Sequence, residues 1–456
     1  MPNKAKTASK PIISAREAAF RTLASYRRDG AWPDKTLDGL IVRNNMSARE
    51  AALATRIING VLQNMMLCDF YIASFSSIEI RKIEPSILDI LRMSIYQLVF
   101  MDRIPDRAAV YEGVALAEKI SNQRAAGFVN AMLRRASQAA KNDDLPIVSG
   151  NTVHILSIRY SHPEWLILEL LKVLDVKSVE RFLSENNEHN LPIFAQVNTL
   201  RTDANGALSS LLAEGIGAAR HGWLDGCIQL KGARGISRID AFAKGFVYIQ
   251  DPAARLSVLA AGLKPGDFVI DGCAAPGGKS FAAAIEMKNS GKIIAYDINK
   301  EKLGHIEKGA ARLGIKIIEV MEKDALAVED TLVGKADIVF ADVPCSGFGI
   351  IRKKPEIRYK SESEVEGLPD IQKQILRSLS RYVKPGGALI YSTCTVLWRE
   401  NENVVDLFLR DNKEFHKEAF SIPGVGYVES GKTTLWPHIH GTDGFFICKI
   451  RRKGIG

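Results

Sequence analysis

The sequence contains no apolar run near the roughly 18 residues that a membrane-spanning helix requires. Its first ten residues are polar and rich in lysine, and they lack the apolar core of a secretory signal peptide. Both absences argue against a membrane partner. We therefore expect a cytoplasmic protein.

Closely paired cysteines are also absent. No two cysteines have the C-x-x-C spacing; they stand at Cys68, Cys227, Cys273, Cys345, Cys394 and Cys448. This pattern argues against a disulfide scaffold and against a structural zinc site, so we expect reduced thiols, mostly in the core. His438 and His440 have no third candidate ligand nearby, which predicts a structural turn there and no metal.

What the chain does have is length and positive charge. With 456 residues it exceeds what one hydrophobic core usually supports, so two or three domains are expected. The net charge of +9 and the pI near 9.1 favour an anionic partner such as nucleic acid, although many soluble proteins share this bias.

Residues 12–141 have the pattern of helices alone. Ser14 and Ser47 are each followed three residues later by a glutamate, as in a capping box. A stripe of apolar residues at helical spacing is found at Ile87, Ile90, Leu91, Ile95 and Leu98. We predict an all-helical first domain over residues 1–141.

A small α+β module is predicted next, after a polar segment at 142–152. Its elements are strands at 194–199, 227–230 and 246–250 and a helix at 204–213. We place this module at 145–250. Because small sheets of this kind often bind RNA, it is a candidate RNA-binding element.

The remaining chain, residues 251–456, alternates strands with helices. Strands are predicted at 268–271, 292–296, 315–320, 337–340 and 388–391, and helices from 277, from 299 and at 371–382. This alternation is typical of a Rossmann-like, doubly wound parallel sheet. The segment 443–450 is expected to close the sheet as an antiparallel strand.

The segment Asp271–Ser280 (DGCAAPGGKS) joins the first of these strands to its helix. A P-loop requires a glycine five residues before its Gly-Lys-Ser, and Cys273 occupies that place. The dinucleotide pattern G-x-G-x-x-G is absent too. What remains is a glycine turn that opens a helix, whose N-terminus can receive a carboxylate.

An acid follows at the end of the next strand. Asp297 lies about 20 residues further on, where a carboxylate accepts ribose hydroxyls. These features predict a ligand with a ribose and an anionic end but no pyrophosphate, and S-adenosylmethionine fits that description. We expect Asp324 at its adenine amino group, although an ordinary surface aspartate is nearly as good an interpretation. We expect the carboxylate of the cofactor at residues 277–279. The alternative is that the glycines of this loop only make a tight turn. The predicted cofactor loop comprises Cys273, Ala274, Ala275, Pro276, Gly277, Gly278 and Lys279.

Two thiols follow strands of the same sheet. Cys345 follows the strand at 337–340, in the segment ADVPCSG, and Cys394 follows the strand at 388–391. Because ligands bind at the carboxyl ends of parallel strands, both thiols are expected to face the cofactor crevice. Cys345 taken alone indicates a catalytic nucleophile, and either cysteine can instead be an inert buried thiol.

Two thiols in one crevice have a chemical use on a pyrimidine. Carbon 5 is too electron-poor to take a methyl group directly, but addition of a thiolate at carbon 6 makes carbon 5 nucleophilic. A second thiol can assist the later release as a general acid or base. The thiolate requires nearby positive charge, for which Lys279, Arg352 and the sulfonium of the cofactor are candidates.

These motifs carry a resemblance to known families. Asp342–Gly347, Tyr391–Cys394, Glu400–Val404 and Cys273–Lys279 together resemble the Nol1/Nop2/Sun family of RNA cytosine-5 methyltransferases. Segments 15–23, 55–61, 91–98 and 128–135 resemble the NusB family of all-helical RNA-binding domains. The combination indicates the RsmB-like branch, which methylates 16S ribosomal RNA.

The resemblance implies a role for each thiol. Cys394 would be the nucleophile that forms the covalent adduct with carbon 6, and Cys345 would help to release the 5-methylcytosine product. It also implies that Asp342 lies against the cytosine and the cofactor. The expected activity is that of an RNA (cytosine-C5-)-methyltransferase with S-adenosylmethionine as its cofactor.

A basic loop follows Cys345, at residues 348–360. Its side chains Arg352, Lys353, Lys354 and Arg358 are predicted to contact RNA phosphates, unless the loop is merely solvated. We expect 16S ribosomal RNA as the partner of a monomeric protein. The alternatives are the same chemistry on transfer RNA, a non-catalytic RNA-binding assembly factor and a small-molecule methyltransferase.

Overall fold

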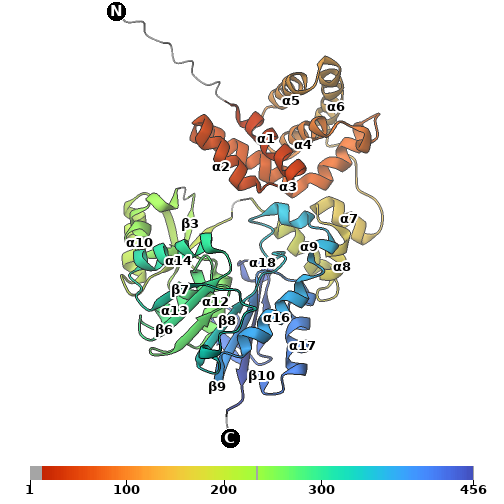
Figure 1. Ribbon diagram of the computed structural model, residues 1–456. Helices are drawn as coiled ribbons and strands as arrows, with labels where there is room; N and C mark the ends of the chain where they lie inside the picture. Colours follow the sequence, from red (N-terminus) through yellow and green to blue (C-terminus); the bar gives the residue numbers. More distant parts are fainter. Residues whose placement is uncertain (1–12, 190, 233–234, 455–456) are drawn as a thin grey trace, which may run out of the picture. The chain divides into compact units, whose positions relative to one another are not determined.

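The computed structural model describes residues 13–454 except 190, 233 and 234 (Figure 1). The chain forms two compact units that divide between Leu168 and Glu169. In the described part of the chain, no helix is long and apolar enough to cross a membrane.

The first unit is built from helices, as the sequence predicts. They are α1 (Ala15–Asp29), α2 (Pro33–Asn44), α3 (Ala48–Phe75), η1 (Ile80–Lys82), α4 (Pro85–Phe100), α5 (Asp106–Ile120), α6 (Gln123–Lys141) and α7 (Thr152–Tyr160), while α8 (Glu164–Leu170) crosses the division. Ser14 and Ser47 cap α1 and α3 through their side chains. Glu50, expected to complete a capping box with Ser47, instead accepts the Ala15 backbone N–H at 2.7 Å and links the two helix starts.

A small antiparallel sheet lies in the second unit, in the strand order β2-β3-β1-β4. Its elements are α9 (Val176–Glu185), β1 (Ile193–Val197), α10 (Ala204–Ala213), β2 (Gly217–Arg220), β3 (Cys227–Lys231), η2 (Ile236–Arg238), α11 (Asp240–Ala243) and β4 (Val247–Ile249). The pattern at 217–220 did not predict β2, because Gly-Ala-Ala-Arg has no β-branched residue and no buried alternate position.

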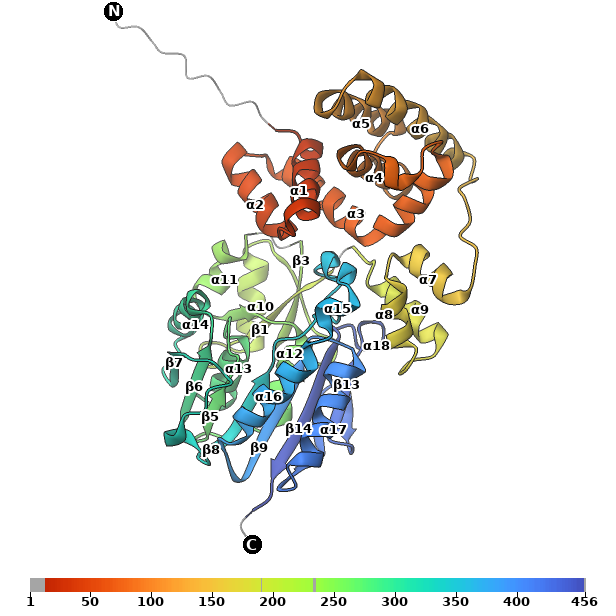
Figure 2. The ribbon, with the colours of Figure 1, turned by 45° about the vertical axis from the view of Figure 1, so that its right-hand side comes forward.

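The large sheet has the order β10-β14-β9-β8-β5-β6-β7, and β13 pairs with β14. Figure 2 shows the run from β7 through β6, β5, β8 and β9 to β14. Its strands are β5 (Phe268–Asp271), β6 (Lys292–Asp297), β7 (Ile318–Glu322), β8 (Ala336–Asp342), β9 (Val383–Thr393), β10 (Phe415–Lys417), β13 (Lys432–Leu435) and β14 (Phe445–Arg452). The first five are parallel neighbours, and β14 runs antiparallel to β9. The predicted closing strand is therefore confirmed.

Helices cover both faces of this sheet. They are α12 (Pro252–Ala261), α13 (Gly278–Glu286), α14 (Lys300–Leu313), α16 (Leu368–Ser380) and α17 (Glu402–Asp411). The other elements of this part are α15 (Glu362–Val365), α18 (Pro437–His440), η3 (Asp330–Leu332), η4 (Pro355–Tyr359), η5 (Trp398–Glu400) and a ribbon of β11 (Phe420–Ile422) and β12 (Gly426–Val428). Side chains of β9 alternate between two cores: Ile390 packs with α12–α14, and Leu389 packs with α16 and α17. The doubly wound class is thereby confirmed.

The strand order explains where a ligand binds. Strand β5 has β6 on one side and β8 on the other, and all three are parallel. The chain therefore leaves β5 and β8 on opposite sides of a topological switch point, and doubly wound sheets bind ligands at the carboxyl ends of the strands at such a point. The cofactor loop and both predicted thiol segments follow strands at this edge.

Candidate active site

The structure brings the two predicted thiols together. Cys345 follows β8 and Cys394 follows β9, and the two strands pair in parallel with Asp342 opposite Ser392. The Sγ atoms of Cys345 and Cys394 are 3.2 Å apart. Both cysteines are half-buried, whereas Cys68, Cys227 and Cys448 are buried in cores. These two thiols are thus in direct contact and reachable from the crevice.

The contact with Cys394 changes the acidity of Cys345. The hydrogen bond to the Cys394 thiol, together with burial, raises the pKa of Cys345 well above its ordinary value. Cys345 therefore holds its proton at neutral pH. A protonated thiol is a proton donor rather than a nucleophile.

Asp342 lies beside the thiols with both carboxylate oxygens engaged. Its Oδ2 forms an ion pair with Lys279 Nζ at 2.5 Å, and its Oδ1 accepts a hydrogen bond from Ser392 Oγ at 2.8 Å. Lys279 is nearly buried, and its ammonium group lies 5.1 Å from the centre of the Phe445 ring. The lysine thus fixes the orientation of Asp342 at the floor of the crevice.

A buried polar cluster supports the thiols from behind. The carboxylate of Glu400 accepts hydrogen bonds from Ser346 N at 2.9 Å, from Ser346 Oγ, and from Gln372 Nε2 at 2.8 Å. Ser346 Oγ also bonds Thr395 Oγ1 at 2.8 Å, and Gln372 donates to the carbonyl of Pro344 at 3.0 Å. Residues adjacent to each thiol are therefore tied to one another.

Sequence reasoning did not assign roles to this cluster. Ser346, Gln372, Thr395 and Glu400 are fully buried, with exposed fractions of 0%. Glu400 stood in one of the segments that resemble the methyltransferase family, but spacing alone gives no partner for it. The sequence signal that could have revealed this cluster was a charged residue and two hydroxyl side chains near the cysteines that follow the strands.

A close backbone contact holds the two thiol loops at a fixed distance. Gly349 N donates to the carbonyl of Cys394 at 2.9 Å, and Gly444 N donates to the carbonyl of Gly349 at 2.8 Å. A Cβ atom at Gly349 would lie 1.8 Å from Gly444 O and 2.7 Å from Cys394 O. Only glycine fits here, because either contact would force backbone to move.

The predicted cofactor loop leads from β5 into α13. Gly277 caps this helix with φ +106° and, as a glycine, has no side chain to accept a hydrogen bond from the first N–H groups. Asp297 lies next to the loop, where its carboxylate accepts the backbone N–H groups of Ala275 at 3.2 Å and Asn299 at 2.9 Å. Asp324 is exposed and accepts the Leu326 N–H at 2.9 Å.

These residues fit S-adenosylmethionine. A Cβ on Gly277 would come within 2.6 Å of the Phe281 ring, so the turn keeps its backbone bare next to the helix N-terminus. Beneath the loop, burial raises the pKa of Asp271 to about 6, and its Oδ1 has no hydrogen-bond partner among the described residues. The helix N-terminus attracts the anionic carboxylate of a ligand, and acidic groups at neighbouring strand ends attract its cationic groups. Both features suit S-adenosylmethionine, which carries both charges.

The basic loop after Cys345 requires a correction. Arg352 and Arg358 are buried, so the prediction that they contact phosphates is wrong. Arg358 donates to Asn187 Oδ1 at 2.7 Å and to the carbonyl of Asn186 at 3.1 Å, and burial lowers its pKa to about 10. The reason is that these two arginines bind residues of this same chain that precede β1. They thereby attach the loop to the small α+β module. The exposed Lys354 stays a predicted RNA contact.

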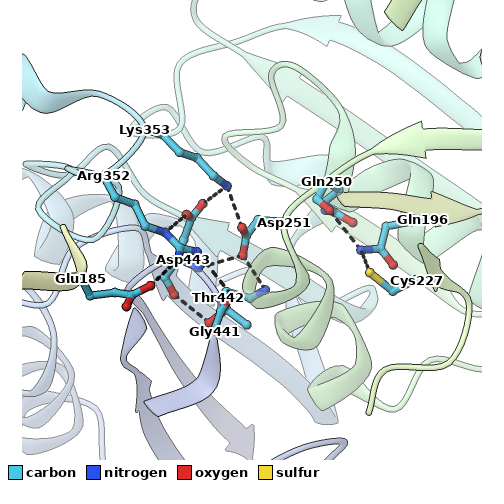
Figure 3. A network of polar contacts seen from close by, with 11 residues as sticks. Glu185, Gln196, Cys227, Gln250, Asp251, Arg352, Lys353, Gly441, Thr442 and Asp443 are labelled. Atoms are coloured by element: carbon cyan, nitrogen blue, oxygen red, sulfur yellow. Dashed lines mark hydrogen bonds and ion pairs between the residues drawn. The ribbon is translucent and has the colours of Figure 1, made fainter. Parts of the chain in front are cut away.

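Lys353 is the centre of a second polar network. Figure 3 shows its ammonium group between Asp251 and Asp443, at 2.7 Å from a carboxylate oxygen of each. Arg352 reaches Asp443 at 3.4 Å and Glu185 at 3.5 Å. The network joins the start of α12, the loop after Cys345 and the turn before β14, so it sets how the thiol loop is anchored.

The histidines of the α18 turn have structural contacts. His440 Nδ1 accepts the N–H of Trp436 at 2.9 Å, and the His438 ring packs 6.1 Å from the rings of Phe182 and Trp436. Within the described ranges, no group of three or more His, Cys, Asp or Glu side chains has an arrangement suited to a metal ion.

Comparison with known proteins gives three family matches along the chain. Residues 13–138 match the NusB family, residues 162–237 match the ferredoxin-like domain of RsmF/B-type methyltransferases, and residues 258–451 match the 16S rRNA methyltransferase family RsmB/F. The predicted NusB-like domain, α+β module and methyltransferase domain are confirmed in kind and order.

Individual relatives extend over nearly the whole chain. The probable ribosomal RNA small subunit methyltransferase B of Bacillus subtilis (strain 168) is 33% identical, covering 97% of this chain and 99% of its own. A protein of the same name from Synechocystis sp. is 30% identical, covering 97% and 100%. The crystal structure of PH0851 has a TM-score of 0.79 at 26% identity, covering 99% and 100%. The chain belongs to the RsmB/F family of 16S rRNA methyltransferases.

Proposed function

We propose that this protein forms 5-methylcytosine in 16S ribosomal RNA, with Cys394 as the nucleophile and Cys345 as the proton-handling thiol. The observation that carries the proposal is the 3.2 Å contact between two thiols at the ends of neighbouring parallel strands. Membership of the RsmB/F family supplies the RNA class. We further propose three domains, at 1–141, 145–250 and 251–456.

The thiols divide the reaction between them. Cys394 adds as a thiolate to carbon 6 of the cytosine, which makes carbon 5 nucleophilic. S-adenosylmethionine supplies the methyl group that carbon 5 takes. The carbon-5 proton then passes to water, and its bonding pair forms the double bond between carbons 5 and 6. Cys394 leaves carbon 6 with the electron pair of the broken bond as a thiolate, to which the Cys345 thiol donates a hydrogen bond. The raised pKa of Cys345 supports a role in moving a proton during this release.

Asp342 serves to hold the base. A carboxylate oxygen accepts a hydrogen bond from the exocyclic amino group of cytosine, which distinguishes cytosine from uracil. Lys279 and Ser392 keep the carboxylate in place at 2.5 and 2.8 Å. Because enzymes that modify a base must take it out of the stack, the target cytosine enters the crevice unpaired.

The residues that would hold S-adenosylmethionine follow β5, β6 and β7. Gly277–Lys279 would bind its carboxylate, Asp297 its ribose hydroxyls and Asp324 its adenine amino group. The bare N-terminus of α13 and the position of Asp297 at the end of β6 support this placement. These residues and the two thiols follow strands at the same edge of the sheet.

Bisulfite sequencing tests the substrate. We expect one or more cytosines of 16S ribosomal RNA to lose methylation when the gene is deleted, and to regain it on complementation. Transfer RNA is sequenced in parallel. Loss of methylation in transfer RNA alone would replace the ribosomal substrate with a transfer RNA, and no loss in either RNA would contradict the activity.

A trapped covalent adduct between protein and RNA tests the separate roles of the two thiols. The Cys345→Ala variant should form the adduct through Cys394 but release it slowly, so a protein–RNA band should accumulate in a denaturing gel. The matched control is Cys448→Ala, which removes a buried thiol on β14. Normal turnover without an adduct in Cys345→Ala would exclude the two-thiol mechanism.

A further inference from the structure

A groove lies between helices α5 and α6 of the first unit. It encloses about 480 Å³ and is lined by one face of each helix. That volume falls within the roughly 300–1,000 Å³ typical of ligand pockets. None of its residues belongs to the site already described.

The floor of the groove is apolar. Val110 and Val114 lie one turn apart on α5 and line the groove, and both also pack against the helical core of the unit. Tyr111 stands next to them with 70% of its surface exposed. An aromatic ring this exposed beside an apolar floor offers a flat surface for stacking.

The rim of the groove is basic. Arg107 on α5 and Arg134 on α6 are exposed, and no ion pair of either is found in the part of the chain that the structure describes. Lys141 lies 3.6 Å from Asp106, the one acid of the lining, and Asp106 also accepts a hydrogen bond from Ser137 at 2.8 Å. The two arginines thus leave net positive charge at the rim.

We propose that this groove binds a single-stranded segment of the RNA substrate, with a base stacked on Tyr111 and phosphates at Arg107 and Arg134. An exposed aromatic ring flanked by cations is the arrangement by which proteins hold unpaired nucleotides. A helical protein partner would not require two unpaired arginines beside the ring. The identification of the ligand as RNA rests on the proposed function.

The test measures binding of the full chain to a 16S ribosomal RNA transcript across a range of salt concentrations. Tyr111→Ala should raise Kd roughly 5- to 150-fold, the range that stacking of one base supplies, and leave the salt dependence unchanged. Arg107→Gln and Arg134→Gln should each reduce the slope of log K against log salt concentration by roughly 0.7, one single-strand phosphate contact.

Matched controls separate the groove from general effects. Tyr427→Ala removes a tyrosine that is also 70% exposed but lies on β12, and it should leave Kd unchanged. Tyr111→Phe keeps the ring and should keep binding. Circular dichroism of each variant confirms folding. Wild-type Kd and slope in folded Tyr111→Ala and Arg134→Gln proteins would overturn the proposal.

Kinetics distinguish this proposal from the proposed function. If the groove binds substrate, Tyr111→Ala raises KM for the transcript and leaves kcat unchanged, because the reacting groups are untouched. Binding that depends on Tyr111 without any methyl transfer by the wild type would preserve the groove and exclude the activity. Methyl transfer with a KM independent of Tyr111 would exclude the groove alone.

Discussion

The residues around the thiol pair form two groups that differ in exposure: a reactive side, which is partly exposed, and a supporting side, which is buried. Cys345, Cys394 and Asp342 are partly exposed to the crevice. Ser346, Gln372, Thr395 and Glu400 lie behind them with no exposed surface. Substitutions on the reactive side should therefore change chemistry without changing stability, whereas substitutions on the supporting side should change both.

The largest effect is expected at Cys394. Cys394→Ser should reduce kcat by at least roughly 10⁴-fold, since a serine hydroxyl is far less ionised and less nucleophilic than a thiol. The urea midpoint should stay within error of the wild type, because the side chain is nearly the same size. Methyl transfer is measured with a 16S transcript. Substantial residual turnover would show that another group attacks carbon 6.

A large stability effect is expected at Lys353. Lys353→Met should cost the second unit about 2–3 kcal/mol of unfolding free energy, because the nearly buried Asp251 and Asp443 lose the cation that they share, although its side chain is 35% exposed. Urea unfolding monitored by tryptophan fluorescence measures it. The control is Lys335→Met, an exposed lysine, for which a change within about 0.5 kcal/mol is expected. Equal midpoints for the two variants would show that the network contributes nothing.

The sequence predicted the reactive side well because its chemistry demands particular residue types. Thiols after strands, an acid and a glycine turn each have a recognisable pattern, and the parallel register then brings them together. The supporting side was missed because Glu400 meets Ser346 and Gln372 only through the fold. Arg352 and Arg358 were mistaken for surface charges for the same reason: charge is visible in a sequence, but burial and partners are not.

The protonation of Asp271, beneath the cofactor loop, makes the stability of the protein depend on pH. Its pKa is raised by burial to about 6, so the folded state binds a proton there that the unfolded state has already lost above its ordinary pKa of 3.8. Its contribution to stability is therefore complete below pH 3.8 and is lost as pH rises to about 6. At about 1.36 kcal/mol for each pKa unit, the loss is roughly 3 kcal/mol.

Asp271→Asn tests this sign. Unfolding free energies of the wild type and the variant are measured without cofactor between pH 4 and pH 8. The difference, variant minus wild type, should grow with pH by up to about 3 kcal/mol and level off above pH 7. A difference that is constant across this range would mean that the carboxyl group of Asp271 titrates alike in both states.

The smallest effect is expected at Glu400, where the supporting side acts on the reactive side. Glu400→Gln keeps the shape and can keep an acceptor oxygen for Ser346 N–H and Gln372, but its N–H₂ group then faces Ser346 Oγ, which must turn to accept. Bonds to a carboxylate become bonds to a neutral amide, which should cost about 1–2 kcal/mol. Because Ser346 follows Cys345 directly, kcat should fall while KM for RNA stays the same. The exposed Glu366→Gln serves as control. A stability loss with unchanged kcat would show that the cluster holds the fold together without positioning the thiols, and would separate the two sides of the site.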